Sequence, residues 1–599
     1  MCGIIGYVGE EAAEEKLIKG LKSLEYRGYD SCGIATPCQI TKTRGRVSNL
    51  EELLDGRYDN SKIGIGHTRW ATHGVANEIN AHPHKVGKIT LVHNGIIENY
   101  AEIKSKLQEQ GAKFVSGTDT EVACALINYY FSQDGDIVSA ILKAKGDLVG
   151  SYAFAIMVDG QESIYATRYK SPLLLGKGKD GNYLASDLSA LSLLAKEFYN
   201  LNENEIAVIS KDKITLENSK LSTPVWEFLN ISSQSVTKQG YDHYMLKEIY
   251  EQSRVIKNTV ENRIKSSLPT FENDGIADIY FRDFDSIHII GCGSAMHAGL
   301  IGKSIIEKYA SVPTYVYVAS EYRYNPPIVK ENPLCIFISQ SGETADTYAS
   351  LEYAKSKGYK TLSIVNKQYT KIATDSDNVI YTYAGDEIAV ATTKGYTTQI
   401  SVLILLALKI ALEKSTLDAE NVKKLTLSLL SDVPNVIEKT LSDRDKIKEV
   451  AKVIYQKNEL FYIGRGLDYY LCKEGSLKLK EISYIHSQDY QAGELKHGTI
   501  SLVTSETPVI AIASIEELLP KTISNLKETK ARGANTILIT PFTPPKESCD
   551  ILIKTKANNL IESIFATTLT IQLLAYEVAC LRDCDIDKPR NLAKSVTVE

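Results

Sequence analysis

The second half of the chain contains an internal repeat, and this repeat limits the possible folds more than any other feature. Three apolar segments recur at offsets of 173, 174 and 175 residues, and the paired positions are Gly291 and Gly464, Cys335 and Val509, and Gly358 and Gly533. Each copy alternates apolar runs with turns and helical patterns, which is typical of a parallel βαβ sheet with helices on both faces. We therefore predict two doubly wound parallel-sheet domains, over residues 280–425 and 455–585.

Residues 1–216 follow a different pattern, in which short strand-like runs alternate with two helical segments. The predicted helices cover residues 14–26 and 120–131, and the predicted strands cover residues 4–9, 62–70, 88–95, 151–158 and 203–210. Strands on both sides of helices favour a mixed sheet layer covered by helices. Residues 217–240 are polar and contain Pro224, so we predict a linker there. The predicted fold class of the whole chain is α/β.

Charge and composition exclude several classes of function. The chain of 599 residues has a formal net charge of −6, which offers no basic surface for nucleic acid or an anionic membrane. The longest uninterrupted apolar run in a helical pattern, residues 402–408, is far shorter than the ~18 residues of a spanning helix. The ten cysteines are scattered without a C-x-x-C pair, as in reduced proteins. We predict a cytoplasmic protein that binds neither membranes nor nucleic acid.

Cys2 follows directly on Met1, and a thiol at this position can act as a nucleophile. If Met1 is removed, Cys2 carries a free α-amine with a pKa of about 7.7–8.0, so one residue supplies both nucleophile and base. The alternative is a small buried residue that opens a strand, and the position alone favours that alternative.

Polar residues at the ends of predicted strands and helices favour the interpretation of Cys2 as a nucleophile. The guanidinium of Arg69 suits a carboxylate, such as that of an amino acid. Asn94 and Gly95 offer an amide and a backbone N–H for an oxyanion hole. Asp119 lies at a predicted helix start, where it either caps the helix or holds an ammonium group.

Five of the ten histidines fall within residues 67–93, so a metal site has to be considered. His82-Pro83-His84 is a possible ligand pair. Because no carboxylate or thiol recurs beside these histidines at regular spacing, we predict neither a metal nor a cofactor.

Together the N-terminal motifs resemble the class II glutamine amidotransferase domain of the N-terminal-nucleophile type. The matching segments are MCGI at 1–4, LEYRGYDS at 24–31, HTRWATHG at 67–74, HNG at 93–95 and SGTDTE at 116–121. The resemblance implies an αββα fold in which Cys2 attacks the carboxamide of glutamine and releases ammonia. It assigns the oxyanion hole to Asn94 and Gly95. It assigns glutamine binding to Arg69, Thr72, His73 and Asp119, and the gate of an ammonia channel to Trp70.

In the second half, the segment SQSGETADT at 339–347 gathers hydroxyls around a glycine. Ser339, Ser341 and Thr344, with Gln340 among them, can present hydroxyl and N–H groups to a monoester phosphate at a helix start. An ST-turn with a helix cap is the alternative, and the segment alone slightly favours it. GCGSAM at 291–296 lacks the third glycine of a dinucleotide fingerprint.

Residues 474–498 carry the most reactive groups of the second half. Lys478, Glu481 and Ile485 share a helical face at i, i+3 and i+7, which points a lysine and a carboxylate the same way. The pair is either a surface ion pair or an acid–base pair that acts beside a carbonyl. His497 follows in a glycine-flanked turn, and Lys594 lies near the C-terminus, where a lysine is usually solvated.

These segments resemble the tandem sugar-isomerase (SIS) domains of the glutamine–fructose-6-phosphate aminotransferases. The matching motifs are CGSA at 292–295, SQSGET at 339–344, AVATTKGYTTQ at 389–399, EGSLKLKEISYIH at 474–486, GELKHG at 493–498 and PRNLAKSVTVE at 589–599. The resemblance implies that ammonia from L-glutamine is transferred to D-fructose 6-phosphate, and that residues 586–599 form a catalytic tail. It assigns sugar binding to Ser339, Gln340, Ser341, Thr344, Ala391, Thr392 and Ala593.

The same resemblance implies the catalytic roles in the second half. Lys594 forms an imine with C2 of the sugar, and Glu481 moves a proton between C1 and C2 with help from Lys478. The partner subunit's His497 opens the sugar ring, which implies a homodimer.

The chain departs from the family pattern at three places. Ala295 replaces a serine of the usual CGTS loop and removes one hydroxyl, and Thr392 replaces a common serine. The second repeat lacks an SQSGET segment, so we predict one sugar site per chain.

Two other functions are open at this point. The amidotransferase could serve another acceptor sugar or run a deglycase reaction, or the chain could be a sugar-phosphate sensor. The presence of Lys478, Glu481 and Lys594 together argues against a sensor.

Overall fold

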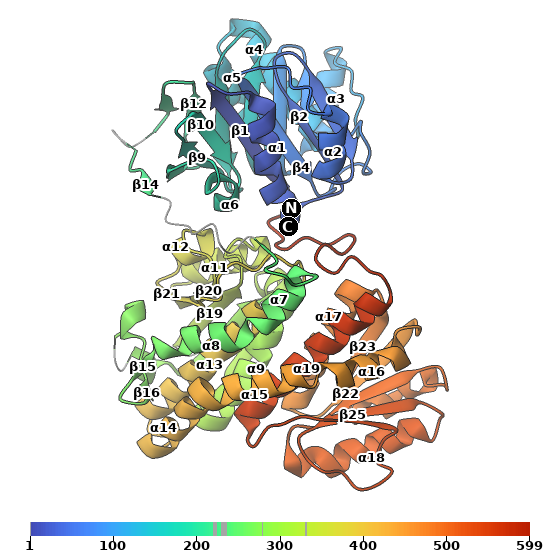
Figure 1. Ribbon diagram of the computed structural model, residues 1–599. Helices are drawn as coiled ribbons and strands as arrows, with labels where there is room; N and C mark the ends of the chain where they lie inside the picture. The colour runs from blue at the N-terminus through green and yellow to red at the C-terminus, as the bar shows by residue number, and fades with distance from the viewer. Residues whose placement is uncertain (1, 220–223, 229–236, 278–279, 330–331, 599) are drawn as a thin grey trace. The chain divides into compact units, whose positions relative to one another are not determined.

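The computed structural model of the chain describes residues 2–219, 224–228, 237–277, 280–329 and 332–598. The predicted linker at 217–240 lies partly outside the described residues. The chain divides into two compact units (Figure 1). Unit 1 is Met1–Ser235 with Ala593–Glu599, and unit 2 is Val236–Leu592. Each unit is described by itself.

Unit 1 contains two sheets whose strand pairs are all antiparallel in the described part of the chain. The eight-stranded sheet has the order β14-β11-β9-β10-β1-β4-β2-β3, and the six-stranded sheet has the order β13-β12-β8-β7-β6-β5. The strands of the first sheet are β1 (Gly3–Gly9), β2 (Ser31–Ala35), β3 (Ile40–Arg44), β4 (Ile63–Arg69), β9 (Leu174–Lys177), β10 (Gly181–Ala185), β11 (Glu197–Asn200) and β14 (Glu227–Phe228). Those of the second are β5 (His84–Val86), β6 (Ile89–Ile97), β7 (Gly150–Val158), β8 (Ile164–Tyr169), β12 (Ile206–Ile209) and β13 (Ile214–Glu217).

The expectation of one mixed sheet layer is therefore wrong for unit 1. Short loops join many neighbouring strands, such as β9 to β10 and β12 to β13, and such loops suit antiparallel pairs. Parallel strands need a crossover connection of a dozen or more residues.

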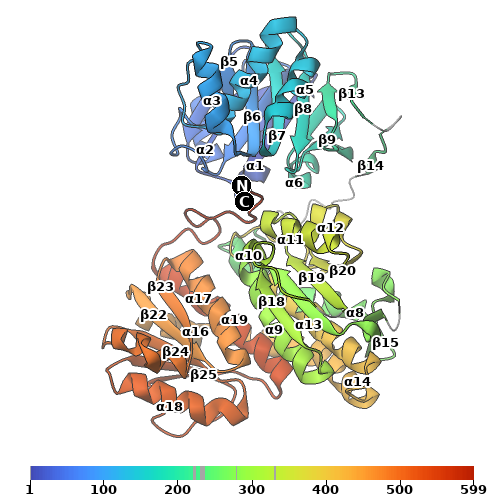
Figure 2. The same ribbon diagram turned by 180° about the vertical axis from the view of Figure 1, so that it is seen from behind.

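Helices cover the outer faces of the two sheets, so unit 1 has four layers in the order α/β/β/α. The helices α1 (Ala13–Leu24), α2 (Val47–Leu54) and α6 (Leu188–Leu191) share a core with the first sheet (Figure 1). The helices α3 (Tyr100–Glu109), α4 (Asp119–Asp134) and α5 (Ile137–Asp147) share one with the second sheet (Figure 2). A third core fills the space between the sheets.

Strand β1 shows why its sequence is apolar along its whole length. Ile5 and Tyr7 belong to the core under α1, whereas Ile4 and Val8 belong to the core between the sheets. Successive side chains of a strand point to opposite faces, so burial on both faces requires a continuous apolar run.

Unit 2 contains two five-stranded parallel sheets with the same strand order, β18-β17-β19-β20-β21 and β23-β22-β24-β25-β26. The first comprises β17 (Ser286–Gly291), β18 (Thr314–Val318), β19 (Pro333–Ser339), β20 (Lys360–Val365) and β21 (Asn378–Tyr381). The second comprises β22 (Glu459–Gly464), β23 (His486–Gln491), β24 (Pro508–Ile512), β25 (Asn535–Thr540) and β26 (Ile551–Lys554). The shared order confirms the predicted repeat and its parallel sheets.

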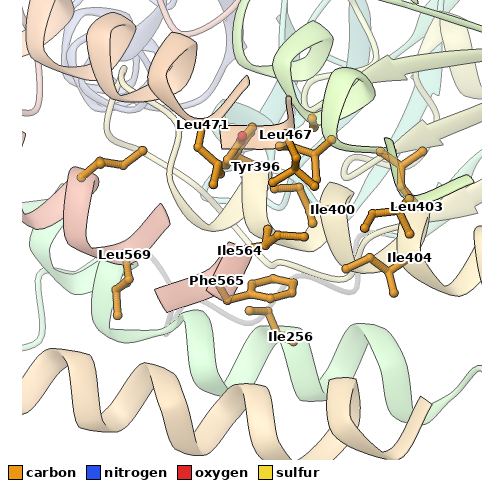
Figure 3. Packing of buried hydrophobic residues seen from close by; sticks show 14 of the residues in the cluster. Ile256, Tyr396, Ile400, Leu403, Ile404, Leu467, Leu471, Ile564, Phe565 and Leu569 are labelled. Atoms are coloured by element: carbon orange, nitrogen blue, oxygen red, sulfur yellow. The ribbon is translucent and has the colours of Figure 1, made fainter. Parts of the chain in front are cut away.

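The helices of unit 2 surround these sheets and pack on one another. They are α7 (Tyr244–Tyr250), α8 (Gln252–Glu261), α9 (Gly293–Ala310), α10 (Ala319–Tyr322), α11 (Ala345–Ser356), α12 (Lys371–Asp375), α13 (Lys394–Glu413), α14 (Ala419–Leu427), α15 (Val433–Ser442), α16 (Arg444–Ile454), α17 (Leu467–Ser483), α18 (Leu519–Lys530) and α19 (Leu560–Leu581). Figure 3 shows side chains of α8, α13, α17 and α19 that meet in one core, among them Ile256, Ile400, Leu403, Leu471, Ile564 and Phe565. This continuous core joins the two repeats into one unit.

Two helices of this core are long and apolar enough to cross a membrane by length and composition. They are α13 and α19, and 94% and 89% of their most apolar windows are buried inside the protein. The uninterrupted apolar run at 402–408 lies within α13 and is only part of it, because isolated polar residues interrupt both helices. One of these, Lys409, pairs with Glu413 at 3.4 Å. Burial identifies both helices as core helices of unit 2.

Candidate active site

Cys2 is the residue just before β1, and it contacts Trp70, which follows β4, and Asn94 of β6. The N–H of Trp70 donates to Sγ of Cys2 at 3.4 Å, and the thiol lies 3.5 Å from the Trp70 carbonyl oxygen. The Cys2 carbonyl accepts hydrogen bonds from Asn94 Nδ2 at 3.0 Å and from Arg27 Nε at 3.2 Å. Burial raises the pKa of the Cys2 thiol, so forming the thiolate requires a base at the site.

The amide of Asn94 is held by a buried histidine, His67, to which the sequence motifs assigned no role. His67 Nε2 lies 3.1 Å from Asn94 Oδ1 and 2.9 Å from the His93 carbonyl oxygen. Both partners are acceptors, so Nε2 carries the proton. Burial lowers the pKa of His67 to about 3, which keeps the ring neutral. The hydrogen bond to Oδ1 directs Nδ2 of Asn94 toward Cys2.

Gly95 continues β6 in a conformation that only glycine adopts without strain. Its φ is 132°, and an added Cβ would lie 2.0 Å from the Ser151 carbonyl oxygen. A side chain at this position would displace β7, the neighbouring strand, and with it the proposed oxyanion hole.

Arg69 and Asp119 are both buried, and both influence the charge at Cys2. Arg69 Nη2 donates to the carbonyls of His73 and of Gly74, the latter at 3.1 Å. The carboxylate of Asp119 accepts the Ile97 N–H at 2.9 Å. Among the factors that act on the pKa of Cys2 after burial, Arg69 lowers it and Asp119 raises it.

Asp119 does not cap α4, so the capping alternative is wrong. Thr118 is the N-cap, and its hydroxyl accepts the Glu121 N–H at 3.2 Å. Thr72 is exposed in the loop after Trp70, and the half-buried ring of His73 packs edge-on against Tyr100 at 5.1 Å.

The histidine-rich stretch forms a buried cluster under this site. The rings of His67 and His82 stack at 4.0 Å, and those of His82 and His84 meet edge-on at 5.0 Å. Burial lowers the pKa of His84 to about 3 as well. Within the described ranges, no group of three or more His, Cys, Asp or Glu side chains could hold a metal ion.

In unit 2, the SQSGET segment forms the turn between β19 and α11. Ser339 Oγ lies 2.9 Å from Thr344 Oγ1 and 3.5 Å from Ser341 Oγ, and it accepts the Gly342 N–H at 3.0 Å. The turn requires glycine, since Gly342 has φ 68° and an added Cβ would lie 2.0 Å from Thr370 Oγ1. The turn therefore gathers three hydroxyls at the start of a helix.

Gln340 and Thr392 lie next to one another beside this turn. Nε2 of Gln340 is buried without a hydrogen-bond partner among the described residues, which leaves a donor for a ligand. Thr392 Oγ1 donates to Glu387 at 2.7 Å. An added Cβ on Gly395 would lie 2.8 Å from Thr392 Oγ1 and 3.1 Å from Gln340 Cγ. The buried Ala391 immediately precedes Thr392.

Lys478 and Glu481 form an ion pair on α17, with Nζ and Oε2 2.5 Å apart. The Lys478 side chain is fully buried and that of Glu481 is 21% exposed, so the surface ion pair alternative is wrong. Burial alone would lower the pKa of Lys478, but the carboxylates of Glu481 and Glu474 outweigh it and raise that pKa. The expected common face with Ile485 is also wrong, because α17 ends at Ser483 and Tyr484 has φ 59°.

The remaining predicted residues come from other segments of the chain. His497 is exposed at the end of a short 3-10 helix, Glu494–His497. Lys594 and Ala593 belong to the tail that groups with unit 1. The first part of the predicted tail at 586–599 is held in unit 2 close to Ala391 along the chain, because the Val390 N–H donates to the Asp587 carbonyl at 3.0 Å.

Comparison with known proteins agrees with both halves of this description. The SIS domain model matches residues 280–409 and 453–582, and the glutamine amidotransferase domain model matches residues 54–246. The glutamine–fructose-6-phosphate aminotransferase [isomerizing] of Clostridium tetani is 45% identical over 619 residues, and that of Caldanaerobacter subterraneus is 44% identical over 618 residues, with full coverage of both chains. The chain belongs to the glutamine–fructose-6-phosphate aminotransferase family.

A solved structure supports this membership for the second half. The C-terminal domain of the glucosamine-fructose-6-phosphate aminotransferase from Francisella tularensis is 37% identical and superposes with a TM-score of 0.56. It covers 59% of this chain and all of the solved chain.

The second repeat of this family member has a carboxylate at the position that the CGSA segment occupies in the first repeat. Asp468 lies 173 residues after Ala295, and Ser514 lies 174 residues after Gln340. The Ser514 N–H donates to both oxygens of Asp468, at 3.1 and 3.0 Å, and its hydroxyl donates to Oδ1. An internal carboxyl group thus uses the donors at this strand end, which supports the prediction of one sugar site per chain.

Asp468 also predicts a pH-dependent contribution to stability. Burial outweighs the hydrogen bonds from Ser514 and raises the pKa of Asp468 to about 7. The folded chain then binds more protons than the unfolded chain above pH ~4, so this contribution is lost as the pH rises to about 7. The free energy of unfolding of the wild-type chain, taken relative to that of the Asp468→Asn variant, should fall by about 2–3 kcal/mol between pH 5 and 7.5. Urea titrations at both pH values measure it, with the exposed Asp283→Asn as control; a constant difference would contradict the raised pKa.

Proposed function

We propose that the chain transfers the amide nitrogen of L-glutamine to D-fructose 6-phosphate, giving D-glucosamine 6-phosphate and L-glutamate. This is the entry step of hexosamine synthesis. The observation that carries the proposal is the presence of two complementary sites in one chain. Cys2 with the Asn94 amide fits an amide hydrolysis, and the hydroxyl turn with the buried Lys478–Glu481 pair fits a sugar phosphate isomerisation.

In unit 1, the Cys2 thiolate attacks the carboxamide carbon of glutamine, and the α-amine of Cys2 takes the thiol proton. Asn94 Nδ2 and the Gly95 N–H stabilise the oxyanion. Collapse of the tetrahedral intermediate expels ammonia and leaves a glutamyl thioester, which water hydrolyses to glutamate. Arg69 and Asp119 bind the α-carboxylate and α-ammonium groups. Thr72 and His73 line the site, and Trp70 gates the path of the ammonia.

In unit 2, the turn Ser339–Thr344 binds the phosphate, with Gln340, Ala391, Thr392 and Ala593 around the sugar. The partner subunit's His497 opens the ring, and Lys594 forms an imine at C2 with loss of water. Ammonia displaces the lysine from C2. Glu481 then removes a proton from C1 and returns it to C2, which completes the isomerisation without a cofactor or metal. We propose a cytoplasmic homodimer.

The test is a reaction of the purified chain with glutamine and a panel of hexose phosphates. Mass spectrometry should find glucosamine 6-phosphate and glutamate in equal amounts with fructose 6-phosphate and no amino sugar with the other phosphates. Glutamate without hexosamine phosphate would point to another acceptor. The absence of both products would support a sugar-phosphate sensor.

A further inference from the structure

Glu474 lies at a junction of the two SIS repeats and is fully buried. Its Oε1 accepts the Ser294 hydroxyl at 2.8 Å, and its Oε2 lies 2.8 Å from His297 Nδ1. Ser294 and His297 belong to α9 of the first repeat. One turn along α17, Lys478 Nζ lies 3.5 Å from Glu474 Oε1. Glu474 therefore connects α9 to the lysine that pairs with Glu481.

The Glu474 carboxylate is ionised in this environment. Burial would raise its pKa, but Lys478 and His297 outweigh burial, and the pKa of Glu474 is lowered. An ionised carboxylate only accepts hydrogen bonds, so His297 Nδ1 carries a proton.

Lys478 consequently lies among several charges from three elements. Glu474 and Glu481 face it on α17, at 3.5 and 2.5 Å. Glu387, from the loop before α13, also raises the pKa of Lys478. On the elements packed around Glu474, His297 donates from α9 and the buried Tyr396 of α13 interacts with Glu474 electrostatically.

In a buried Lys–Glu pair, the proton can move from the lysine to the carboxylate, which leaves two neutral groups. Low dielectric favours this transfer because it removes both charges. A protonated Glu481 cannot remove a proton from C1. The nearby anion Glu474 opposes the transfer, because it is 3.5 Å from the ammonium and two helical turns away from Glu481 along α17.

We propose that Glu474 is a positioning residue that keeps the proton on Lys478, so that Glu481 stays a carboxylate ready to act as base. Ser294 and His297 hold Glu474 in place from the other repeat. This inference rests on the proposed sugar isomerisation. It also gives the hydroxyl of Ser294 a function within the site, whereas the neighbouring Ala295 has no hydroxyl.

The test is the pH profile of glucosamine 6-phosphate synthesis by Glu474→Gln, measured with saturating fructose 6-phosphate. Loss of one anion near Lys478 should move the alkaline limb down by about one to two pH units. It should lower kcat about tenfold or more at pH 8, with KM for the sugar within about twofold. Glutamine hydrolysis in unit 1 should be unchanged.

The chain supplies a matched control in Glu413→Gln. Glu413 is the last residue of α13 and is also buried. It pairs with Lys409, four residues earlier, at 3.4 Å. In this variant the alkaline limb of the pH profile should stay in place. The loss of a buried ion pair that does not include Lys478 should not change the pKa of Lys478.

Glu474→Asp keeps the charge but withdraws the carboxylate from Lys478, so the alkaline limb should move down by less than it does in Glu474→Gln, and kcat at pH 8 should fall in step with it. It decides the question if Glu474→Gln does not fold, as judged by near-UV circular dichroism; unchanged kcat would then overturn the inference. A Glu474→Gln profile that matches Glu413→Gln would overturn it too. If the wild-type chain forms no glucosamine 6-phosphate, the proposed function itself fails.

Discussion

Replacing Cys2 with alanine should abolish glutamine-dependent formation of glucosamine 6-phosphate and leave the ammonia-dependent reaction intact. The thiol is the only atom of the unit 1 site proposed to bond to the substrate carbon, and loss of a nucleophile costs about 10⁴-fold or more. Added ammonium salts bypass the step, because the sugar site of unit 2 contains its own chemistry. The measurement compares both nitrogen sources on one preparation.

Cys38 provides the control for this result, because it is an exposed free cysteine of the same unit. Cys38→Ala should retain both activities. Glutamine-dependent synthesis by Cys2→Ala would contradict the assignment of the nucleophile. The mass of the mature N-terminus is a second check, since a retained Met1 would block the amine that acts as base.

The repeat and the apolar strands were predictable from the sequence because they depend on local patterns. Central strands such as β19 are buried on both faces and appear as continuous apolar runs. The edge strand β23, His486–Gln491, is polar and largely half-buried, so no apolar pattern marks it, and the predicted helical face runs to Ile485, the residue just before it. An edge strand is fixed by backbone pairing, here with β22, which side-chain patterns do not record.

The motif residues of the candidate site were also predictable, whereas the groups that hold them were not. Lys478 and Glu481 are three residues apart, so helical spacing alone brings them together. Ser294 and Glu474 are 180 residues apart, yet their side chains share a hydrogen bond. His67 and Asn94 likewise come from different strands. Such contacts follow from tertiary packing, and a single sequence gives no signal of them.

Both sites also show charges placed where water is excluded. Arg69 and Asp119 are each 3% exposed, and Lys478 and Glu474 are not exposed. Buried charges are costly unless they are paired. Their presence around the Cys2 thiol and around the Lys478–Glu481 pair therefore favours catalysis over stability as the reason for their placement.

Replacing Glu481 with glutamine should stop the proton transfer while the sugar still reacts with Lys594. Glutamine preserves shape but cannot accept a proton from carbon, and loss of a general base costs about 10²–10⁴-fold. Synthesis of glucosamine 6-phosphate should fall by this factor. In deuterated water, a proton held on Glu481 can exchange with solvent before it reaches C2, and the amount of product that carries deuterium at C2 should fall in parallel. Borohydride should still trap fructose 6-phosphate on Lys594, because imine formation precedes the step that Glu481 performs.

The surface pair of α16 provides a control with the same spacing. Glu449 and Lys452 lie 2.6 Å apart at i, i+3 and are largely exposed, and Glu449→Gln should change neither synthesis nor trapping. Normal synthesis by Glu481→Gln would remove Glu481 from the mechanism. Loss of trapping together with synthesis would assign Glu481 to sugar binding or ring opening, since the covalent step would then fail first. Retained trapping with lost deuterium transfer is the one combination that separates imine chemistry from proton transfer and assigns the second to Glu481.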